Sequence, residues 1–351
     1  MWININEYFI EVTYQLIINS NYYSIEMNGG IGKIEMLKRT NILALVGGGE
    51  NPRFSPRKII IWDDHQGNII GILILNKEIL NVRLRNDKIF GVCDDKIYIF
   101  NLNTLENIST LETFENPTGI IAISSGDFDK LIIAYPIKCQ GLLNFRNCYD
   151  SKTIKSSKII KAHQSKISCL SINNNGTLLA SSSENGTKIR IFNLDNGENI
   201  SAFKRGIKTG IMENITFATN NIFLGYVSDA GIIQIFSIFD ITKKINEKNN
   251  DNNEQIKKEK EKESNIQINE NEPKNRKSLL GKIREIFNIE DFDKNFVKLK
   301  IQEEYGLLSF GNDNTIVVIT KDGKYIKAAY DPINGGHCQV FEEKNFLKDE
   351  S

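Results

Sequence analysis

Two adjacent basic residues, Lys204 and Arg205, could hold an anion. Neighbouring side chains of a β-strand point to opposite sides, so such a pair can supply one cation to each of two pockets. The whole chain carries 44 basic and 44 acidic residues. An anion must therefore be held by a local cluster and not by the field of the whole protein. The alternative interpretation is a solvated basic pair without a ligand.

A second segment that could take part in binding is 278–287. Its apolar residues recur at the spacing of one helical face. Ser278 can cap the start of this helix. Nearby basic residues each contribute about 1 kcal/mol beside anionic lipid. The pattern predicts a short helix in a membrane interface, and its inserted side chains would be Leu279, Leu280, Ile283, Ile286 and Phe287. The alternative is a helix packed against the protein's own side.

Several classes of function are disfavoured by the sequence. The five cysteines are scattered without a C-x-x-C pair and there are three histidines, so we expect no metal site, disulfide framework or cofactor. We find no nucleophile paired with a base, and therefore expect no catalytic residues and no enzyme. A net charge of zero disfavours nucleic acid as a partner.

Membrane-spanning and secreted proteins are also disfavoured. The chain has no apolar run of about 18 residues, which a transmembrane helix needs. The N-terminus has no basic region typical of a signal peptide. We therefore expect a cytosolic protein that reaches membranes only peripherally.

Short strands separated by turns must position these residues. The turns are rich in Gly, Asn and Asp, which tolerate left-handed backbone. Many short strands without intervening helices indicate an all-β fold. A strand that ends in an aromatic residue recurs about every 40 residues, a period that fits one four-stranded propeller blade. Its copies lie at 59–64, 96–100, 188–192 and 232–236.

This repeat predicts a single β-propeller domain over residues 1–351. Six units are expected at about 33–76, 79–113, 119–160, 165–203, 212–301 and 305–347. The first 32 residues are too few for a full blade, so we expect a seven-bladed WD-type propeller with an incomplete first blade. Residues 239–296 form an insertion in blade 6. Its part 243–277 is dominated by Lys, Glu and Asn and cannot bury a core.

Three segments resemble the PROPPIN family, which is called WIPI in animals. IEMLKRTNILALVGGGENPRFSPRKIIIWDD (34–64) resembles the family's second blade. Residues 162–206 resemble its fifth blade and end in FKRG, where the family has F/L-R-R-G. Residues 308–347 resemble its last blade. The resemblance covers residues 29 to 347 and implies a β-propeller that binds polyphosphoinositides.

The resemblance also implies which residues hold the lipid. An inositol headgroup is a compact polyanion with roughly −1.5 to −2 charges on each monoester phosphate. Lys204 replaces the family's arginine and lacks its bidentate fork, so we expect weaker or less selective binding. By position, the first pocket would combine the basic pair with His163, Ser181, Ser183, Thr187 and Arg190. For His163 and Thr187, the alternative is a purely structural role.

A second pocket is implied in the sixth blade, where relatives read S-D-x-G-T-V-H-I-F. Ser228 is retained, but Ile232 stands at the threonine position and Gln234 at the histidine position. Ile207 likewise replaces the Ser/Thr often found after the signature glycine. An alkyl group cannot donate to phosphate. We therefore expect one good lipid site and one poor one.

Relatives use a loop of the second blade to bind a large lipid-transfer protein of autophagy. The corresponding residues are Pro52, Arg53, Pro56 and Arg57. Two prolines lower the cost of ordering this loop on binding, although a structural role alone is equally compatible. We expect a monomer.

The function implied by the resemblance is that of a phosphoinositide effector, a scaffold in autophagy or endosomal trafficking. Its ligands would be phosphatidylinositol 3-phosphate and the 3,5-bisphosphate. It would act on endosomal, vacuolar or autophagosomal membranes. The alternative is a protein-interaction propeller with weak or lost lipid binding, which Ile207, Ile232 and Gln234 make credible.

Overall fold

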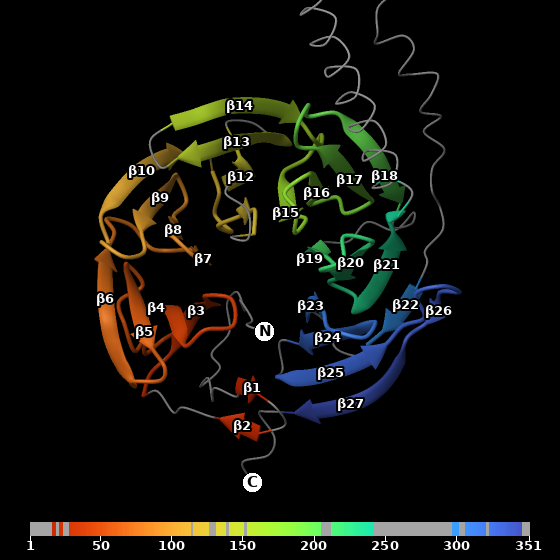
Figure 1. Cartoon of the computed structure of the whole chain (residues 1–351), viewed down its shortest axis with the longest axis horizontal. Coiled ribbons are helices and arrows are strands. Elements are labelled where there is room, and N and C mark those ends of the chain that lie inside the picture. Colours follow the sequence, from red (N-terminus) through yellow and green to blue (C-terminus); the bar gives the residue numbers. More distant parts are fainter. Residues whose placement is uncertain are drawn as a thin grey trace, which may run out of the picture.

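A ring of β-sheets makes up the part of the chain that the structure, a computed structural model, describes (Figure 1). Each complete sheet begins near the centre of the ring and ends at its rim. The described residues are 16–18, 21–23, 28–113, 115–125, 131–137, 140–150, 153–204, 212–239, 241, 297–301, 306–320 and 323–345.

Six sheets of four or five strands follow one another along the chain, and we number them blades 2 to 7. Blade 2 contains β3 (Ile31–Met36), β4 (Ile42–Gly47), β5 (Lys58–Asp63) and β6 (Asn68–Ile74). Blade 3 contains β7 (Asn81–Arg85), β8 (Lys88–Val92), β9 (Lys96–Asn101) and β10 (Asn107–Glu112). Blade 4 contains β11 (Ala122–Ile123), β12 (Leu131–Pro136), β13 (Leu142–Asp150) and β14 (Thr153–Lys161).

The remaining blades have the same antiparallel order, with one addition. Blade 5 contains β15 (Ile167–Ile172), β16 (Leu178–Ser183), β17 (Lys188–Asn193) and β18 (Asn199–Lys204). Blade 6 contains β19 (Met212–Phe217), β20 (Phe223–Ser228), β21 (Ile232–Ser237), β22 (Val297–Lys300) and β26 (Gly336–His337). Blade 7 contains β23 (Gly306–Phe310), β24 (Thr315–Thr320), β25 (Lys324–Ala329) and β27 (Gln339–Asn345).

The predicted all-β propeller is confirmed, and the six predicted units coincide with blades 2 to 7. A two-stranded sheet of β1 (Leu16–Ile18) and β2 (Asn21–Tyr23) precedes them. Figure 1 shows this sheet in the ring between blades 7 and 2. It lies where the sequence predicts the first blade.

Neighbouring blades pack face to face through apolar side chains. On β17, Ile189 and Ile191 lie in a buried cluster shared with blade 6. Phe192 lies in the cluster shared with blade 4. Because strand side chains alternate, the even positions 188 and 190 lie on the blade 4 side of the sheet.

Blade 6 has a fifth strand that the repeat pattern did not predict. The short β26 pairs in parallel with β22, with Val297 opposite Gly336 and Lys298 opposite His337. A segment between β25 and β27 of blade 7 therefore covers the outer edge of blade 6. The predicted insertion falls between β21 and β22, and its predicted helix at 278–287 lies outside the described residues.

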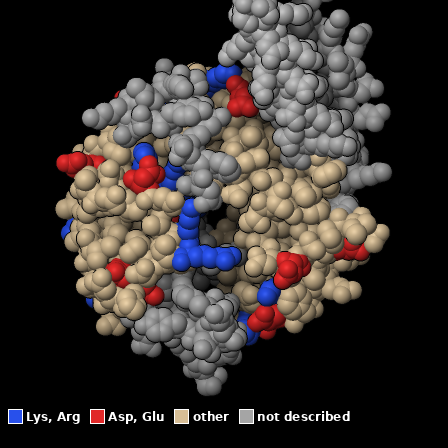
Figure 2. Space-filling model, in the orientation of Figure 1, with Lys and Arg blue, Asp and Glu red and all other residues tan. Residues whose placement is uncertain are grey.

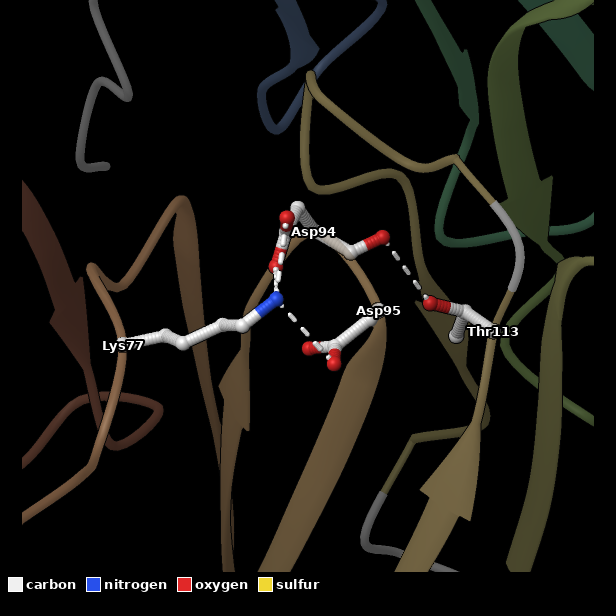
Figure 3. Close-up of polar contacts among 4 residues, drawn as sticks. All are labelled: Lys77, Asp94, Asp95 and Thr113. Atoms are coloured by element: carbon white, nitrogen blue, oxygen red, sulfur yellow. Dashed lines mark hydrogen bonds and ion pairs between the residues drawn. The ribbon is translucent and has the colours of Figure 1, made fainter.

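Polar contacts link the β6–β7 connection, the β8–β9 turn and the residue that follows β10 (Figure 3). Lys77, between β6 and β7, lies 2.9 Å from Asp94 and 3.1 Å from Asp95 in the β8–β9 turn. The Thr113 hydroxyl donates to the Asp94 carbonyl at 3.3 Å. The hydrogen bond from Lys77 lowers the pKa of Asp94. Lys77 thus shares its charge between the two carboxylates, and we interpret the cluster as a structural link.

Candidate anion-binding site on blade 5

His163 lies in the connection from blade 4 to blade 5 and is buried. Its backbone N–H and that of Ala162 both donate to the carbonyl of Gly141, at 3.1 and 2.8 Å. Its ring lies between two groups of blade 5. Nδ1 is 2.8 Å from Arg190 Nη1, and Nε2 is 2.9 Å from Ser181 Oγ.

These contacts fix the protonation of the imidazole. A guanidinium can only donate, so Nδ1 accepts from Arg190 and a neutral ring carries its proton on Nε2, which donates to Ser181. Burial, together with the charge of Arg190, lowers the pKa of His163 to about 4. His163 is therefore neutral at physiological pH and helps to hold Arg190 in position.

The neutral state of His163 predicts a loss of stability in acid. The unfolded chain protonates histidine near its ordinary pKa of about 6.5. Between that value and about 4, the unfolded state binds the extra proton, so the free energy of unfolding decreases as the pH falls. The free energy of unfolding should fall by at most about 3 kcal/mol. Urea unfolding of the wild type and of His163→Gln, from about pH 7 to about pH 4.5, should measure this decrease.

The matched control is His65→Gln, because His65 is exposed on the β5–β6 turn. His163→Gln should flatten the acid dependence, whereas His65→Gln should keep the wild-type curve. An equal acid-induced loss in His163→Gln and the wild type would contradict the assignment.

Three cations lie on the blade 4 side of blade 5. Arg190 is opposite Ser181 on β16, and Lys188 is opposite Lys204 on β18. Arg190 also donates from Nη1 to the Ala162 carbonyl at 3.0 Å. Its other two guanidinium nitrogens have no hydrogen-bond partner among the described residues, so they remain available to an anion.

The other first-pocket candidates lie at the same end of the blade. Ser183 ends β16 on the side of Ser181, and Thr187 lies in the turn that leads to Lys188. Arg205 lies outside the described residues. The structure therefore places Ser181, Ser183, Arg190 and Lys204 on one side of blade 5, with Thr187 in the adjoining turn. His163 contacts Ser181 and Arg190 directly.

Ser228 lies in a different place from the first-pocket residues. It is buried at the end of β20, on the side of blade 6 that faces blade 5. Its Oγ accepts the Ile232 N–H at 3.3 Å. Gln234 on the neighbouring strand is also buried and accepts a hydrogen bond from Tyr226 OH at 2.5 Å. These polar groups already have partners inside the protein.

Lys188 is a basic residue of this face that sequence reasoning did not select. It was visible only as the first residue of the recurring strand KIRIF. Its relation to Lys204 depends on the register of β17 and β18. Among the described residues, no carboxylate lies within ion-pair distance of Lys188.

Ser181 and His163 are residue types that can form a nucleophile and its general base. Their hydrogen bond, however, has the wrong direction for such a pair. A base would need an unprotonated Nε2 facing the hydroxyl, whereas here Nε2 donates to Ser181. Ser181 is also fully buried. In the described part of the chain, no group of His, Cys, Asp or Glu could hold a metal ion.

The loop between β4 and β5 contains the four predicted partner-binding residues. Pro52, Arg53 and Arg57 are exposed, and Pro56 is partly buried. The loop packs against the start of blade 2, because Arg53 N–H donates to the Gly30 carbonyl at 3.0 Å. A side chain at Gly47 would collide with the Phe54 carbonyl. The loop is therefore an ordered surface.

Charges of both signs are distributed around the described surface. Figure 2 shows basic side chains beside the central opening and acidic ones scattered around the ring. On the inner strands β3 and β7, Arg83 pairs with Glu35 at 3.1 Å. The described residues contain no helix that is long and apolar enough to span a membrane.

Comparison with known proteins adds a family assignment. The PROPPIN family model matches residues 34–259. SVP1-like protein 2 of Schizosaccharomyces pombe is 34% identical over 60% of this chain and 57% of its own length. Autophagy-related protein 18 of Dictyostelium discoideum is 34% identical over 63% of this chain and 59% of its own length. The chain therefore matches less than two thirds of the length of these relatives.

Solved structures have the same fold. Kluyveromyces lactis Hsv2 with its complete loop 6CD has a TM-score of 0.67, with 19% identity over 93% of this chain and 90% of that chain. A complex of KlAtg21 with the coiled-coil of AgAtg16 also has a TM-score of 0.67, with 18% identity over 92% and 89% of the two chains. Because the family model matches more than half of its length, the chain belongs to the PROPPIN family.

Proposed function

We propose that this protein is a non-enzymatic effector that binds phosphoinositides on membranes and acts as a scaffold in autophagy or endosomal trafficking. The observation that carries the proposal is the basic face of blade 5, with Lys188, Arg190 and Lys204 on one side of the sheet. Such a cluster suits a phosphorylated headgroup, because cations and fixed donors compensate its dense charge. Membership in the PROPPIN family and relatives named for autophagy support the proposal.

Phosphatidylinositol 3-phosphate and the 3,5-bisphosphate are the proposed ligands. The site on blade 5 would bind the headgroup. The segment 278–287 would add a second contact through its apolar residues, because a single weak membrane anchor is marginal. The protein would then act on endosomal, vacuolar or autophagosomal membranes.

A protein partner would bind the loop that contains Pro52, Arg53, Pro56 and Arg57. Its two exposed arginines favour an acidic partner segment. We propose a lipid-transfer protein of autophagy in this role, with the propeller itself a monomer. The solved complex of the related KlAtg21 with a coiled-coil supports the general idea of a propeller that binds a protein.

The second candidate function is a protein scaffold that binds lipid weakly. One observation favours it: Ser228 and Gln234, the polar groups of the second pocket, are buried with partners inside blade 6. Attachment to a membrane would then depend on the blade 5 site alone and on the apolar residues of the segment 278–287, which makes it weak.

Vesicle flotation of the full chain separates these two functions. Three vesicle preparations should be compared: phosphatidylcholine with phosphatidylinositol 3-phosphate, with the 3,5-bisphosphate, and with enough phosphatidylserine to match the charge. The proposal expects flotation with the phosphoinositides and little with phosphatidylserine. Equal flotation with all three, or none, would contradict it and favour the scaffold.

A further inference from the structure

Ile333 is the most exposed large apolar side chain of the described residues, with an exposed fraction of 83%. It lies in the turn between β25 and β26, and this turn is held by its own hydrogen bonds. The Asp331 carboxylate accepts the N–H groups of Ile333 and Asn334 at 2.8 and 2.9 Å. Gly335 N–H donates to the Asp331 carbonyl at 3.2 Å. An ordered turn thus presents an apolar side chain at the surface. A single exposed apolar residue is common, so its surroundings decide whether it has a role.

The turn adjoins the place where the insertion of blade 6 ends. The strand β26 follows the turn directly and pairs with the first residues of β22, Val297 and Lys298. Cys338 N–H also donates to the Lys298 carbonyl at 3.2 Å. The insertion 239–296 rejoins the described chain at Val297 and contains the proposed membrane segment 278–287. The turn is therefore fixed beside the base of a segment that we propose to contact a membrane.

Two lysines of β22 give this edge of blade 6 a positive charge. Lys298 and Lys300 are exposed, and their partners on β21 are Gln234 and Ile232. Gln234 is two residues from Phe236, which packs against blade 5. Since cross-strand partners share a face, both lysines lie on the side of blade 6 that faces blade 5. In the part of the chain that the structure describes, neither lysine has a carboxylate within ion-pair distance.

The acidic residues of the neighbouring outer strand, β27 of blade 7, have basic partners. Glu342 pairs with Lys344 at 2.9 Å. Glu343 pairs with Lys324 at 2.7 Å. The carboxylate of Asp331 is directed at N–H groups of its own turn. These carboxylates therefore oppose the approach of an anionic surface only weakly.

The outer edge of blade 6 and the site on blade 5 lie on the same side of the ring. Figure 1 shows β18, which ends at Lys204, and the pair β22–β26 on one side, with β6 on the opposite side. A flat bilayer that touches this side can meet both places at once. An apolar tip flanked by lysines suits its interface, where apolar groups reach the acyl chains and cations stay among the headgroups.

We infer that the outer edge of blade 6 is a further membrane contact, in which Ile333 enters the interface and Lys298 and Lys300 bind anionic lipid headgroups. This inference rests on the proposed function. The turn is already ordered, so binding does not have to offset a large loss of conformational entropy there. The contact orients the propeller with blades 5 and 6 toward the bilayer.

Ile333→Thr tests the apolar part of this contact, because threonine keeps the branched Cβ and removes apolar area. The full chain should lose affinity about fivefold for vesicles of phosphatidylcholine, phosphatidylserine and phosphatidylinositol 3-phosphate. Ile74→Thr is the matched control, because Ile74 is 71% exposed on β6, on the opposite side of the ring. It should bind these vesicles like the wild type.

Lys298→Gln with Lys300→Gln tests the charged part. A lysine near an anionic surface contributes about fivefold in affinity, so the double variant should lose about tenfold or more at low salt. Arg53→Gln with Arg57→Gln is the control, because it lowers the net charge equally on blade 2. A calorimetric titration with soluble inositol 1,3-bisphosphate should give the wild-type affinity for every variant, because the contact lies outside the blade 5 site.

These measurements separate a failure of the inference from a failure of the proposed function. If Ile333→Thr bound the vesicles as the wild type does, the inference would be wrong, the proposed function would stand, and the turn would be open to a protein partner. An equal loss for vesicles and soluble headgroup would assign the effect to the blade 5 site and also contradict the inference. A wild type that binds no phosphoinositide vesicles would contradict both.

Discussion

Gly141→Ala is expected to decrease the free energy of unfolding by about 3 kcal/mol or more. Gly141 precedes β13 with φ +74°, and a Cβ there would lie 1.9 Å from the His163 carbonyl oxygen. The same glycine accepts the backbone N–H groups of Ala162 and His163. The added methyl group must therefore push the connection between blades 4 and 5 away. Urea unfolding at neutral pH measures the effect.

Gly67→Ala is the control for backbone strain alone. Gly67 has φ +65° in the β5–β6 turn, and a Cβ there meets no atom within 4 Å. Its replacement should cost only the strain of a left-handed residue, about 1–2 kcal/mol. Gly141→Ala should also weaken headgroup binding, because His163 positions Arg190. If the two variants lost equal stability, the close contact with His163 would not be the cause.

The propeller could be predicted from sequence because its determinants are local. Turn residues such as Asp195-Asn196-Gly197 and the alternation of KIRIF mark individual strands. Their recurrence then gives the six sheets of four or five strands. The predicted bounds of the fifth blade, 165–203, agree with strands that run from Ile167 to Lys204.

Long-range pairing could not be predicted in the same way. β26 has only two residues, and it joins β22 although Gly336 and Val297 are far apart in the sequence. Nothing in the composition of Gly336 and His337 indicates a strand. The predicted unit 305–347 was assigned wholly to the last blade, so the fifth strand of blade 6 was missed.

The candidate site was predicted in its composition but not in its internal contacts. The resemblance selected His163, Ser181 and Arg190 without showing that the two ring nitrogens of His163 contact Ser181 and Arg190. Lys188 was missed because its position opposite Lys204 depends on strand register. A shift of one residue would place a side chain on the other face, so composition alone cannot reveal such a pair.

Lys204→Thr combined with Arg205→Thr is expected to abolish flotation with phosphoinositide vesicles. Lys204 lies at the end of β18 on the side of Arg190, where it can contact the headgroup directly. Arg205 follows it in the sequence and was predicted to serve the opposite side of the strand. The double change thus removes charge from both predicted pockets. The floated fraction should fall to that of vesicles without phosphoinositide.

Lys38→Asn with Arg39→Thr is the matched control for this loss, because it removes another adjacent Lys–Arg pair, from the exposed turn between β3 and β4. Lys38 has φ +50°, a backbone conformation that asparagine tolerates and threonine does not. Both variants lower the net charge by two, so general attraction to an anionic surface falls equally. Threonine suits a strand, and equal unfolding temperatures of the two variants would show that the loss of flotation is not a loss of folding. Equal flotation of the two variants would mean that the membrane is recognised by overall charge and not by blade 5.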